Sequence, residues 1–214
     1  MGEQERSKRT KYKIMEAAAQ VFFEHGYDGA KIEQILTAAG VTKGALYHHY
    51  KSKQEIADAL LQQHVGDIAV EPQEVKLLEL VVKGQRLVEG LQRDAVQRAA
   101  ARLTLEEGSN QLDRKQAMSL WTEYVEALLV EAGRRHELLP SVNNPERIRK
   151  VAEMYVGAFA GIQLLADVSS EGHDRAGLPH QLAVFFEHTL PTVAAPHVLP
   201  RLRLQIERLS RTGA

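Results

Sequence analysis

IEQILTAAGVTKGALYHHYKSK, residues 32–53, predicts two short helices joined by a tight turn. Its first half places apolar side chains at helical spacing, so one face of the first helix is expected to be buried. Gly40 follows, and glycine readily adopts the left-handed conformation that ends a helix sharply. Thr42 is a favourable N-cap for a second helix from Lys43 to about Tyr50. This arrangement is a helix-turn-helix, whose second helix can enter the major groove of DNA.

The second helix is expected to bury Ala45 and Leu46 and to expose a polar and aromatic face. A glycine inside a helix costs about 1 kcal/mol relative to alanine. Gly44 is therefore best explained if a phosphate or a base edge must approach the backbone. The alternative is a face that is merely solvated. We predict that Tyr47 and His48 lie near bases, and that Lys43 and Gly44 lie at phosphates.

The run GVTKGALYHHYKSKQEI, residues 40–56, resembles the recognition-helix signature of TetR-family repressors. RLTLEEG, SLWTEYVEALL and MYVGAFAGIQLLADV extend the resemblance to one branch of that family, the γ-butyrolactone receptors of actinomycetes. The resemblance covers most of the chain, and the later half more loosely. It implies an all-α fold: an N-terminal three-helix DNA-binding domain, residues 1–53, and a larger helical domain for ligand binding and dimerisation, residues 54–214.

The resemblance also implies further contacts with DNA. Family members often have threonine at the start of the second helix, where it caps the helix and binds a phosphate. Lys31 stands there in this chain; it loses the cap but can reach a phosphate through its long stem. Lys53 is expected on a phosphate, at the start of the next helix. The predicted DNA-binding residues are Lys31, Thr42, Lys43, Gly44, Tyr47, His48 and Lys53.

Composition limits the other possibilities. The net charge is −1, but residues 1–53 hold nine Lys or Arg and six acidic residues, so they carry +3 and the remainder carries −4. This asymmetry favours DNA at the N-terminal end. The absence of cysteine excludes disulfides and thiolate chemistry. The charged N-terminus is not a signal peptide, and no run approaches the roughly 18 apolar residues of a membrane span. We expect a cytoplasmic protein without membrane contact.

The rest of the chain predicts helices throughout. Residues 1–7 are expected to form a loose tail, followed by a helix from about Ser7 that ends at Gly26. Ser52 and Glu55 form a capping box for a linker helix from Gln54 to about Asp67. Further helices are expected at about 74–91, 94–107, 113–136, 145–168, 180–193 and 197–210.

Three features favour a ligand cavity in the second domain. A lone tryptophan such as Trp121 on an amphipathic helix is more often core than pocket, but the resemblance reverses this, because the receptor branch has a tryptophan here that lines the cavity. Residues 154–168 are apolar nearly all round, and their small residues either leave space or allow close helix packing. His64 stands where the branch has a polar residue, although it is also explained as an exposed histidine. The predicted ligand-binding residues are His64, Trp121, Tyr124, Tyr155, Ala158, Phe159 and Gln163.

Gln163 is a polar group in an apolar run and must find a partner. Ala158 departs from the threonine expected in this branch, so a hydroxyl contact to the ligand is missing. The ligand is then a γ-butyrolactone, a related butenolide or a furan, or the cavity has lost its native ligand.

We hypothesise a repressor that binds a pseudo-palindromic operator as a dimer and is released by the ligand. Such a repressor would control antibiotic or other secondary-metabolite genes. The last two or three helices are the candidates for dimerisation, through Phe185, Leu190, Leu199 and Leu202, although this stripe also fits an intramolecular core. The alternative is a DNA-binding regulator that senses no small molecule. No phosphate loop, HExxH or Gly-x-Ser-x-Gly motif is present, so we expect no catalytic residue, metal or cofactor.

Overall fold

The computed structural model describes residues 2–66, 70–105, 114–169 and 176–211. These residues form ten α-helices and one 3-10 helix, and their only pairing of strand type is an isolated bridge between Leu138 and Ala194. The prediction of an all-α fold is confirmed. Among the helices in the described ranges, none has the length and apolar character needed to cross a membrane.

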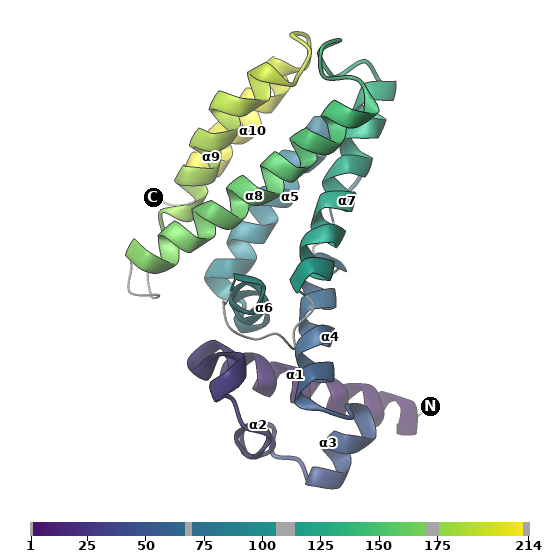
Figure 1. Cartoon of the computed structure of the whole chain (residues 1–214), viewed down its shortest axis with the longest axis vertical. Helices are drawn as coiled ribbons and strands as arrows, with labels where there is room; N and C mark the ends of the chain where they lie inside the picture. Colours follow the sequence, from purple (N-terminus) through teal and green to yellow (C-terminus); the bar gives the residue numbers. More distant parts are fainter. Residues whose placement is uncertain (1, 67–69, 106–113, 170–175, 212–214) are drawn as a thin grey trace. The chain divides into compact units, whose positions relative to one another are not determined.

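The chain divides into two compact units, residues 1–67 with 93–117 and residues 68–92 with 118–214. The helices of the first unit are α1 (Gly2–Gly29), α2 (Ile32–Ala39), α3 (Lys43–His49), α4 (Lys53–Gly66) and α6 (Ala95–Leu105). The helices of the second are α5 (Lys76–Arg93), most of α7 (Arg114–Arg134), α8 (Pro145–Ser169), α9 (Leu178–Thr189), η1 (Leu190–Thr192) and α10 (Leu199–Arg211), all labelled or traceable by colour in Figure 1.

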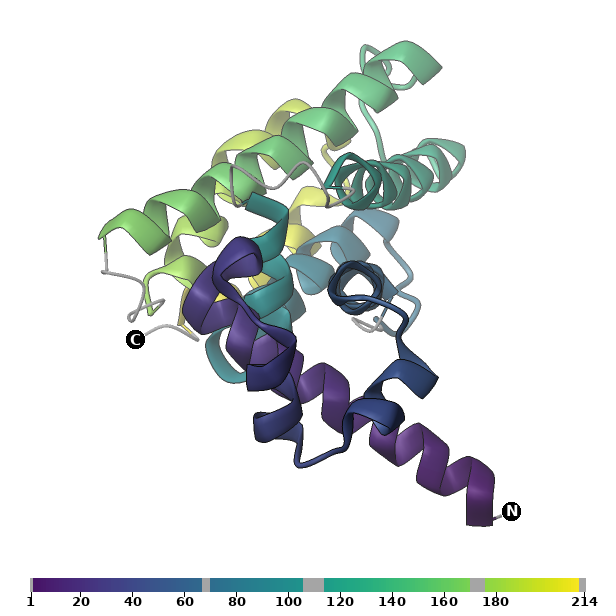
Figure 2. The same cartoon turned by 60° about the horizontal axis from the view of Figure 1, so that its bottom comes forward.

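The first unit is built around α1, whose fully buried face carries Ile14, Ala18 and Phe22. The shorter helices α2 and α3 both lie below α1 in Figure 1, and they come to the front in Figure 2, where α1 is purple. Helices α4 and α6 contribute to the same core through Ile56, Ala57, Leu60, Leu61, Val96, Ala99 and Leu103. The predicted boundary after Lys53 therefore does not coincide with this division. The short helices α2 and α3 cover only part of the apolar surface of α1, and α4 and α6 bury the rest.

Helix α1 is longer than the sequence pattern predicted. It begins at Gly2, within the predicted loose tail, because Gln4, Glu5 and Arg6 are good helix formers. Gly26 was expected to end this helix. Its backbone angles, φ 69° and ψ 177°, break the helix there, but the chain then resumes a helical course to Gly29.

The second unit is a bundle in which α9 packs against both α8 and α10. At Gly84 of α5 an added Cβ would lie 3.0 Å from Leu182 and 3.1 Å from Phe186, so the small residue brings α5 and α9 close together. Pro191 lies inside the predicted helix 180–193. Because proline lacks an N–H, α9 ends at Thr189 and the chain continues as η1.

A buried carboxylate fixes the start of α5. Glu137 is 3% exposed and accepts hydrogen bonds from the backbone N–H groups of Lys76, at 2.9 Å, and Leu77, at 3.0 Å. A carboxylate at a helix N-terminus satisfies unpaired N–H groups and interacts favourably with the helix dipole. Helix α8 begins at Pro145, as predicted, and the Asn144 side chain caps it by accepting a hydrogen bond from the N–H of Arg147 at 3.0 Å.

Candidate functional site

The turn between α2 and α3 has the predicted geometry. Gly40 adopts the left-handed conformation with φ 61° and ψ 38°. Val41 is half-buried and packs against the core of the first unit. The Thr42 hydroxyl accepts a hydrogen bond from the N–H of Ala45 at 3.2 Å, so Thr42 is the N-cap of α3. This cap holds the start of α3 at a fixed angle to α2.

The exposed face of α3 carries the residues predicted to meet DNA. Leu46 is fully buried and anchors the helix, whereas Lys43, Gly44 and His48 are exposed. Tyr47 is 42% exposed, a high value for a large aromatic side chain. The Lys43 ammonium lies 6.0 Å from the centre of the Tyr47 ring. The face thus combines a cation, an aromatic edge and a stretch of accessible backbone.

Gly44 is not required by packing inside the protein. Apart from its chain neighbours and the backbone of α3, no atom of the described residues lies within 4 Å of the position that a Cβ would occupy there, and its φ is not positive. An alanine would therefore fit without strain and would favour the helix. The missing side chain leaves space only on the solvent side, where a partner would lie.

Lys31 is exposed at the N-terminus of α2, as expected for a phosphate contact. Without a threonine at residue 31, a hydrogen bond from a different side chain stabilises the start of α2. The Gln34 side-chain oxygen accepts a hydrogen bond from the backbone N–H of Lys31 at 2.8 Å. The start of α2 is therefore well defined without a side-chain cap at residue 31.

Lys53 has an internal role that the sequence did not reveal. Its ammonium donates to the backbone carbonyls of Tyr27, at 2.7 Å, and Ala30, at 3.0 Å, and lies 4.4 Å from the centre of the Tyr27 ring. Lys53 thus ties the start of α4 to the chain just after the Gly26 kink. These two bonds occupy two of its three N–H donors, so Lys53 is more than the simple phosphate ligand we predicted.

Two adjacent histidines end α3. The rings of His48 and His49 meet edge to face with centres 5.1 Å apart. Burial lowers the pKa of His49, and the charges of His48 and Lys11 lower it further. A pKa below the ordinary 6.5 keeps His49 neutral at pH 7.

In the second unit, two predicted ligand residues lie together on α7. The rings of Trp121 and Tyr124 meet edge to face with centres 6.2 Å apart, and both side chains are half-buried. The ammonium of Lys83, on α5, lies 4.5 Å from the centre of the Tyr124 ring and 5.5 Å from that of Trp121. We call Lys83, Trp121 and Tyr124 the aromatic–lysine cluster.

Lys83 is 6% exposed, and burial lowers its pKa. Burial raises the pKa of Tyr124, and the negative charge of Glu79 raises it further. Our sequence analysis missed Lys83. The available signal was its spacing: Lys76, Glu79 and Lys83 recur at i, i+3 and i+7 within an amphipathic helix and therefore share one face.

The other predicted ligand residues lie on α8. Tyr155, Phe159 and Gln163 follow one another at four-residue spacing, which places them along one side of the helix. Tyr155 is 4% exposed and packs edge to face on Phe185, with ring centres 5.2 Å apart. Burial raises the pKa of Tyr155 to about 12.

Gln163 is 8% exposed, and its side-chain oxygen has no hydrogen-bond partner within the described part of the chain. Buried polar atoms almost always have partners, so this oxygen is available to a group that enters the bundle.

Ala158 and Phe159 are half-buried. His64 lies in the last turn of α4, and its side chain is outside the described residues. The predicted residues thus form one set on α7 and another on α8.

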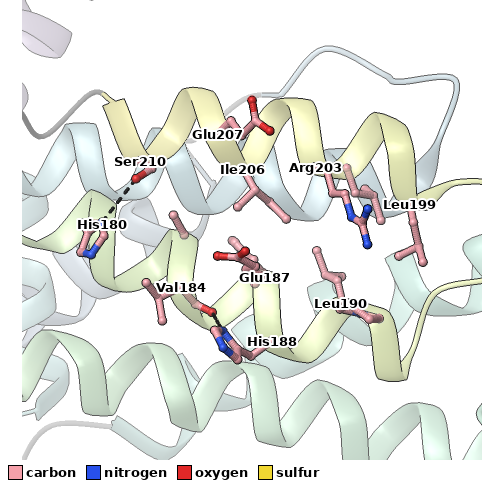
Figure 3. Close-up of a pocket in the computed structure, with 14 residues that line it drawn as sticks. His180, Val184, Glu187, His188, Leu190, Leu199, Arg203, Ile206, Glu207 and Ser210 are labelled. Carbon is pink, nitrogen blue, oxygen red and sulfur yellow. Dashed lines mark hydrogen bonds between the residues drawn. The ribbon is translucent and has the colours of Figure 1, made fainter.

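A groove of about 550 Å³ lies between α9 and α10 (Figure 3). His180 and Ser210 meet at one end, with Nδ1 and Oγ 3.3 Å apart, and Glu187 and Arg203 line the middle. Leu190 and Leu202, which were predicted in a stripe that fits either an interface or a core, are each 1% exposed. They belong to the core of this unit.

Exposed apolar side chains gather instead on α8 and α9. On α8, Met154 is 45%, Leu164 52% and Leu165 66% exposed, and on α9 Val184 is 40% exposed. Gly161 lies between Met154 and Leu164, and no described residue outside the α8 backbone and its chain neighbours has an atom within 4 Å of where its Cβ would be. This surface is apolar and close to the α8 backbone.

Comparison with known proteins agrees with the geometry of the first unit. The family described as bacterial regulatory proteins, tetR family, matches residues 14–60. The chain is 33% identical to the A-factor receptor protein of Streptomyces griseus over 218 positions, which cover 100% of this chain and 76% of that protein.

Two solved structures have the same fold. Full-length native TylP, a TetR regulator from Streptomyces fradiae, is 36% identical with a TM-score of 0.86, over 97% of this chain and 96% of that one. A γ-butyrolactone receptor described as ArpA-like has a TM-score of 0.68 over 96% of this chain and 98% of that one; at 21% identity it supports the fold alone. With a full-length relative above 30% identity and an exposed recognition helix, this chain belongs to the TetR family of bacterial transcription regulators.

Proposed function

We propose that this protein is a transcriptional repressor that binds operator DNA as a homodimer and is released by a small signalling molecule. The observation that carries the DNA-binding role is the exposed face of α3, where Lys43, Gly44, Tyr47 and His48 surround an open stretch of backbone. Solvation alone does not account for a helix-weakening glycine beside a largely exposed tyrosine. A protein in this role works where the chromosome is, so we expect it in the cytoplasm.

Lys31, Lys43 and Gly44 are proposed to contact phosphates, and Tyr47 and His48 to contact bases. Phosphate contacts fix the register of α3, whereas base contacts provide the sequence preference. Thr42 acts first as the N-cap that positions this helix. Lys53 acts first by holding the end of α1, and its remaining N–H donor is proposed to meet a phosphate.

The proposed dimer forms through α8 and α9. Exposed Met154, Leu164, Leu165 and Val184 supply apolar area, and Gly161 allows a second helix to approach closely. Two such helices from each subunit would form a four-helix bundle. A two-fold dimer presents two recognition helices to half-sites that are one or more helical turns apart, which corresponds to a pseudo-palindromic operator.

The proposed effector is a γ-butyrolactone, a butenolide or a furan. Support comes from the full-length similarity to a protein named the A-factor receptor, and from the aromatic–lysine cluster and the free Gln163 oxygen, which offer apolar ring faces and polar groups inside a helical bundle. By analogy with its Streptomyces relatives, we propose that the genes under control belong to antibiotic or other secondary metabolism.

Release follows from thermodynamic linkage. If the effector favours a helix arrangement in which the two heads no longer match the operator spacing, effector and DNA must weaken each other by the same factor. Within the first unit, α4 and α6 both hold the end of α1: Lys53 binds the Tyr27 and Ala30 carbonyls, and Arg102 donates to the Phe23 carbonyl. A shift of either helix would therefore reorient the head.

The test is a titration of Trp121 fluorescence with γ-butyrolactones, butenolides and furans, with operator gel shifts run in parallel. Trp121 is the only tryptophan, so the signal reports on one position. We expect a saturable change that releases DNA at the same ligand concentrations. The competing function is a regulator without small-molecule sensing, which the missing hydroxyl at Ala158 favours. Operator binding that persists with every compound, without a fluorescence change, would establish that second function.

A further inference from the structure

The buried amide of Gln163, on α8, differs from the other polar side chains inside the second unit. Gln163 is 8% exposed, and its side-chain oxygen accepts no hydrogen bond within the described part of the chain. The other buried polar or charged side chains described in this unit are all engaged, by hydrogen bonds or by aromatic rings, namely Glu79, Glu137, Thr122 and Lys83. The amide oxygen of Gln163 therefore needs a separate explanation.

Packing does not explain a glutamine at this position. Gln163 lies on the inner face of α8, where Tyr155 and Ala166 are also buried and Phe159 is half-buried. A buried polar atom without a hydrogen bond lowers stability. Methionine has nearly the same length and would fill the same space without that loss. The amide is therefore best explained by a group that binds beside it.

The chemistry of the amide limits what that group is. A side-chain amide oxygen only accepts hydrogen bonds, so its partner must carry an O–H or N–H donor. Phe159 and Ala166, each about one turn away on the same face, are apolar, so the rest of the partner is expected to be apolar as well. A charged ammonium would lose far more hydration than a hydroxyl on entering such surroundings. An apolar molecule with a hydroxyl group fits these requirements.

We propose that Gln163 is a specificity-determining residue of the effector site, and that its side-chain oxygen accepts a hydrogen bond from a hydroxyl on a substituent of the effector ring. The ring and carbonyl oxygens of a lactone cannot supply this contact, because they are acceptors themselves. This assignment rests on the proposed function and narrows it to those γ-butyrolactones, butenolides and furans whose apolar substituent carries a hydroxyl.

The test is a cycle of two ligands and two proteins, measured by isothermal titration calorimetry. The ligands are an alkyl-substituted γ-butyrolactone with one hydroxyl on its alkyl chain and the matching compound without that hydroxyl. The proteins are the full-length chain and Q163M. A hydrogen bond between neutral groups is worth roughly 2- to 10-fold in affinity. We expect the unchanged protein to prefer the hydroxylated lactone by such a factor, and Q163M to bind both lactones almost equally.

A second measurement needs no ligand. Because Q163M removes an unpaired buried oxygen, it should raise Tm by roughly 2–12 °C. Q163L makes a similar change and carries both tests if Q163M does not fold. The matched control is Y155F, which removes another buried polar atom from the same face, about 12 Å earlier along the helix. One hydroxyl cannot reach both positions, so Y155F should keep the full preference for the hydroxylated lactone.

The outcomes separate the two claims. An unchanged protein that binds no lactone, butenolide or furan refutes the proposed effector class and this inference with it. If the unchanged protein binds both lactones and Q163M keeps the same preference between them, the assignment of Gln163 is overturned and the proposed function stands. A lower Tm in both Q163M and Q163L would also overturn it, because the amide would then be satisfied inside the protein.

Discussion

Replacing Gly44 with alanine is expected to stabilise the protein and weaken its binding to DNA. Gly44 is the second residue of α3, and its φ is not positive. Beyond its own helix backbone and chain neighbours, no atom in the described ranges lies within 4 Å of where a Cβ would be. The methyl group therefore causes no clash in the free protein. Relative to glycine, alanine favours a helix by roughly 0.5–1 kcal/mol. For a chain of this length, a gain of about 1 kcal/mol raises Tm by roughly 2–4 °C.

The same methyl group would lie between α3 and the DNA backbone. Overpacking of a close contact typically costs about 1–3 kcal/mol, which corresponds to a loss of roughly 5- to 150-fold in affinity. Thermal unfolding followed by circular dichroism gives the first quantity. Fluorescence anisotropy with a labelled operator, at one fixed salt concentration, gives the second.

A matched variant is G29A, at the end of α1, where an added Cβ would make an ordinary 3.5 Å contact with His25. It should leave operator affinity unchanged. If G44A gains stability yet binds the operator as tightly as the unchanged protein, the glycine is not there to admit DNA, and our interpretation of the α3 face is wrong.

Three further changes follow from particular contacts. K53A removes the bonds to the Tyr27 and Ala30 carbonyls, so we expect a lower Tm and a salt dependence of operator affinity that is shallower by roughly one unit; an unchanged slope would remove Lys53 from the phosphate contacts. The folded protein resists protonating His49, whereas the unfolded chain binds that proton near pH 6.5, so stability should fall as the pH drops below about 6.5. In H49N, Tm should fall less between pH 7.5 and 5.5 than in the unchanged protein. If Tm falls equally in both proteins, His49 is not the cause of the pH dependence. L165E places a charge on the proposed dimer surface, so we expect monomers in gel filtration with light scattering, and weaker operator binding. If L165E remains a stable dimer, the dimer interface does not include this surface.

The helix-turn-helix was predictable because its determinants are local. The left-handed Gly40 and the cap at Thr42 involve residues at most four positions apart, so their residue types predict the conformation. The ends of other helices were less predictable. The Gly26 kink and the early start of α1 depend on how well the helix continues beyond a break, which packing against α4 and α6 favours.

The resemblance to the receptor branch made Trp121 a predicted ligand residue, and the polarity of Gln163 in an apolar run singled it out, but the environment of both residues required the fold. The spacing of residues 154–168 left open whether the small residues pack or leave space. In the structure, Gly161 has open space outside, whereas Tyr155 and Gln163 are buried.

The sequence by itself determined the all-α class, the helix-turn-helix and the family, because these depend on helical periodicity, turn residues and a contiguous motif. Only the tertiary structure decided what Lys53 and Lys83 do. Lys53 binds carbonyls 26 and 23 positions earlier in the chain, and Lys83 meets rings on another helix. A long, flexible cation in an amphipathic helix is equally compatible with solvent, a phosphate or an internal partner. Its partner is set by which helices pack together, and sequence spacing does not contain that information.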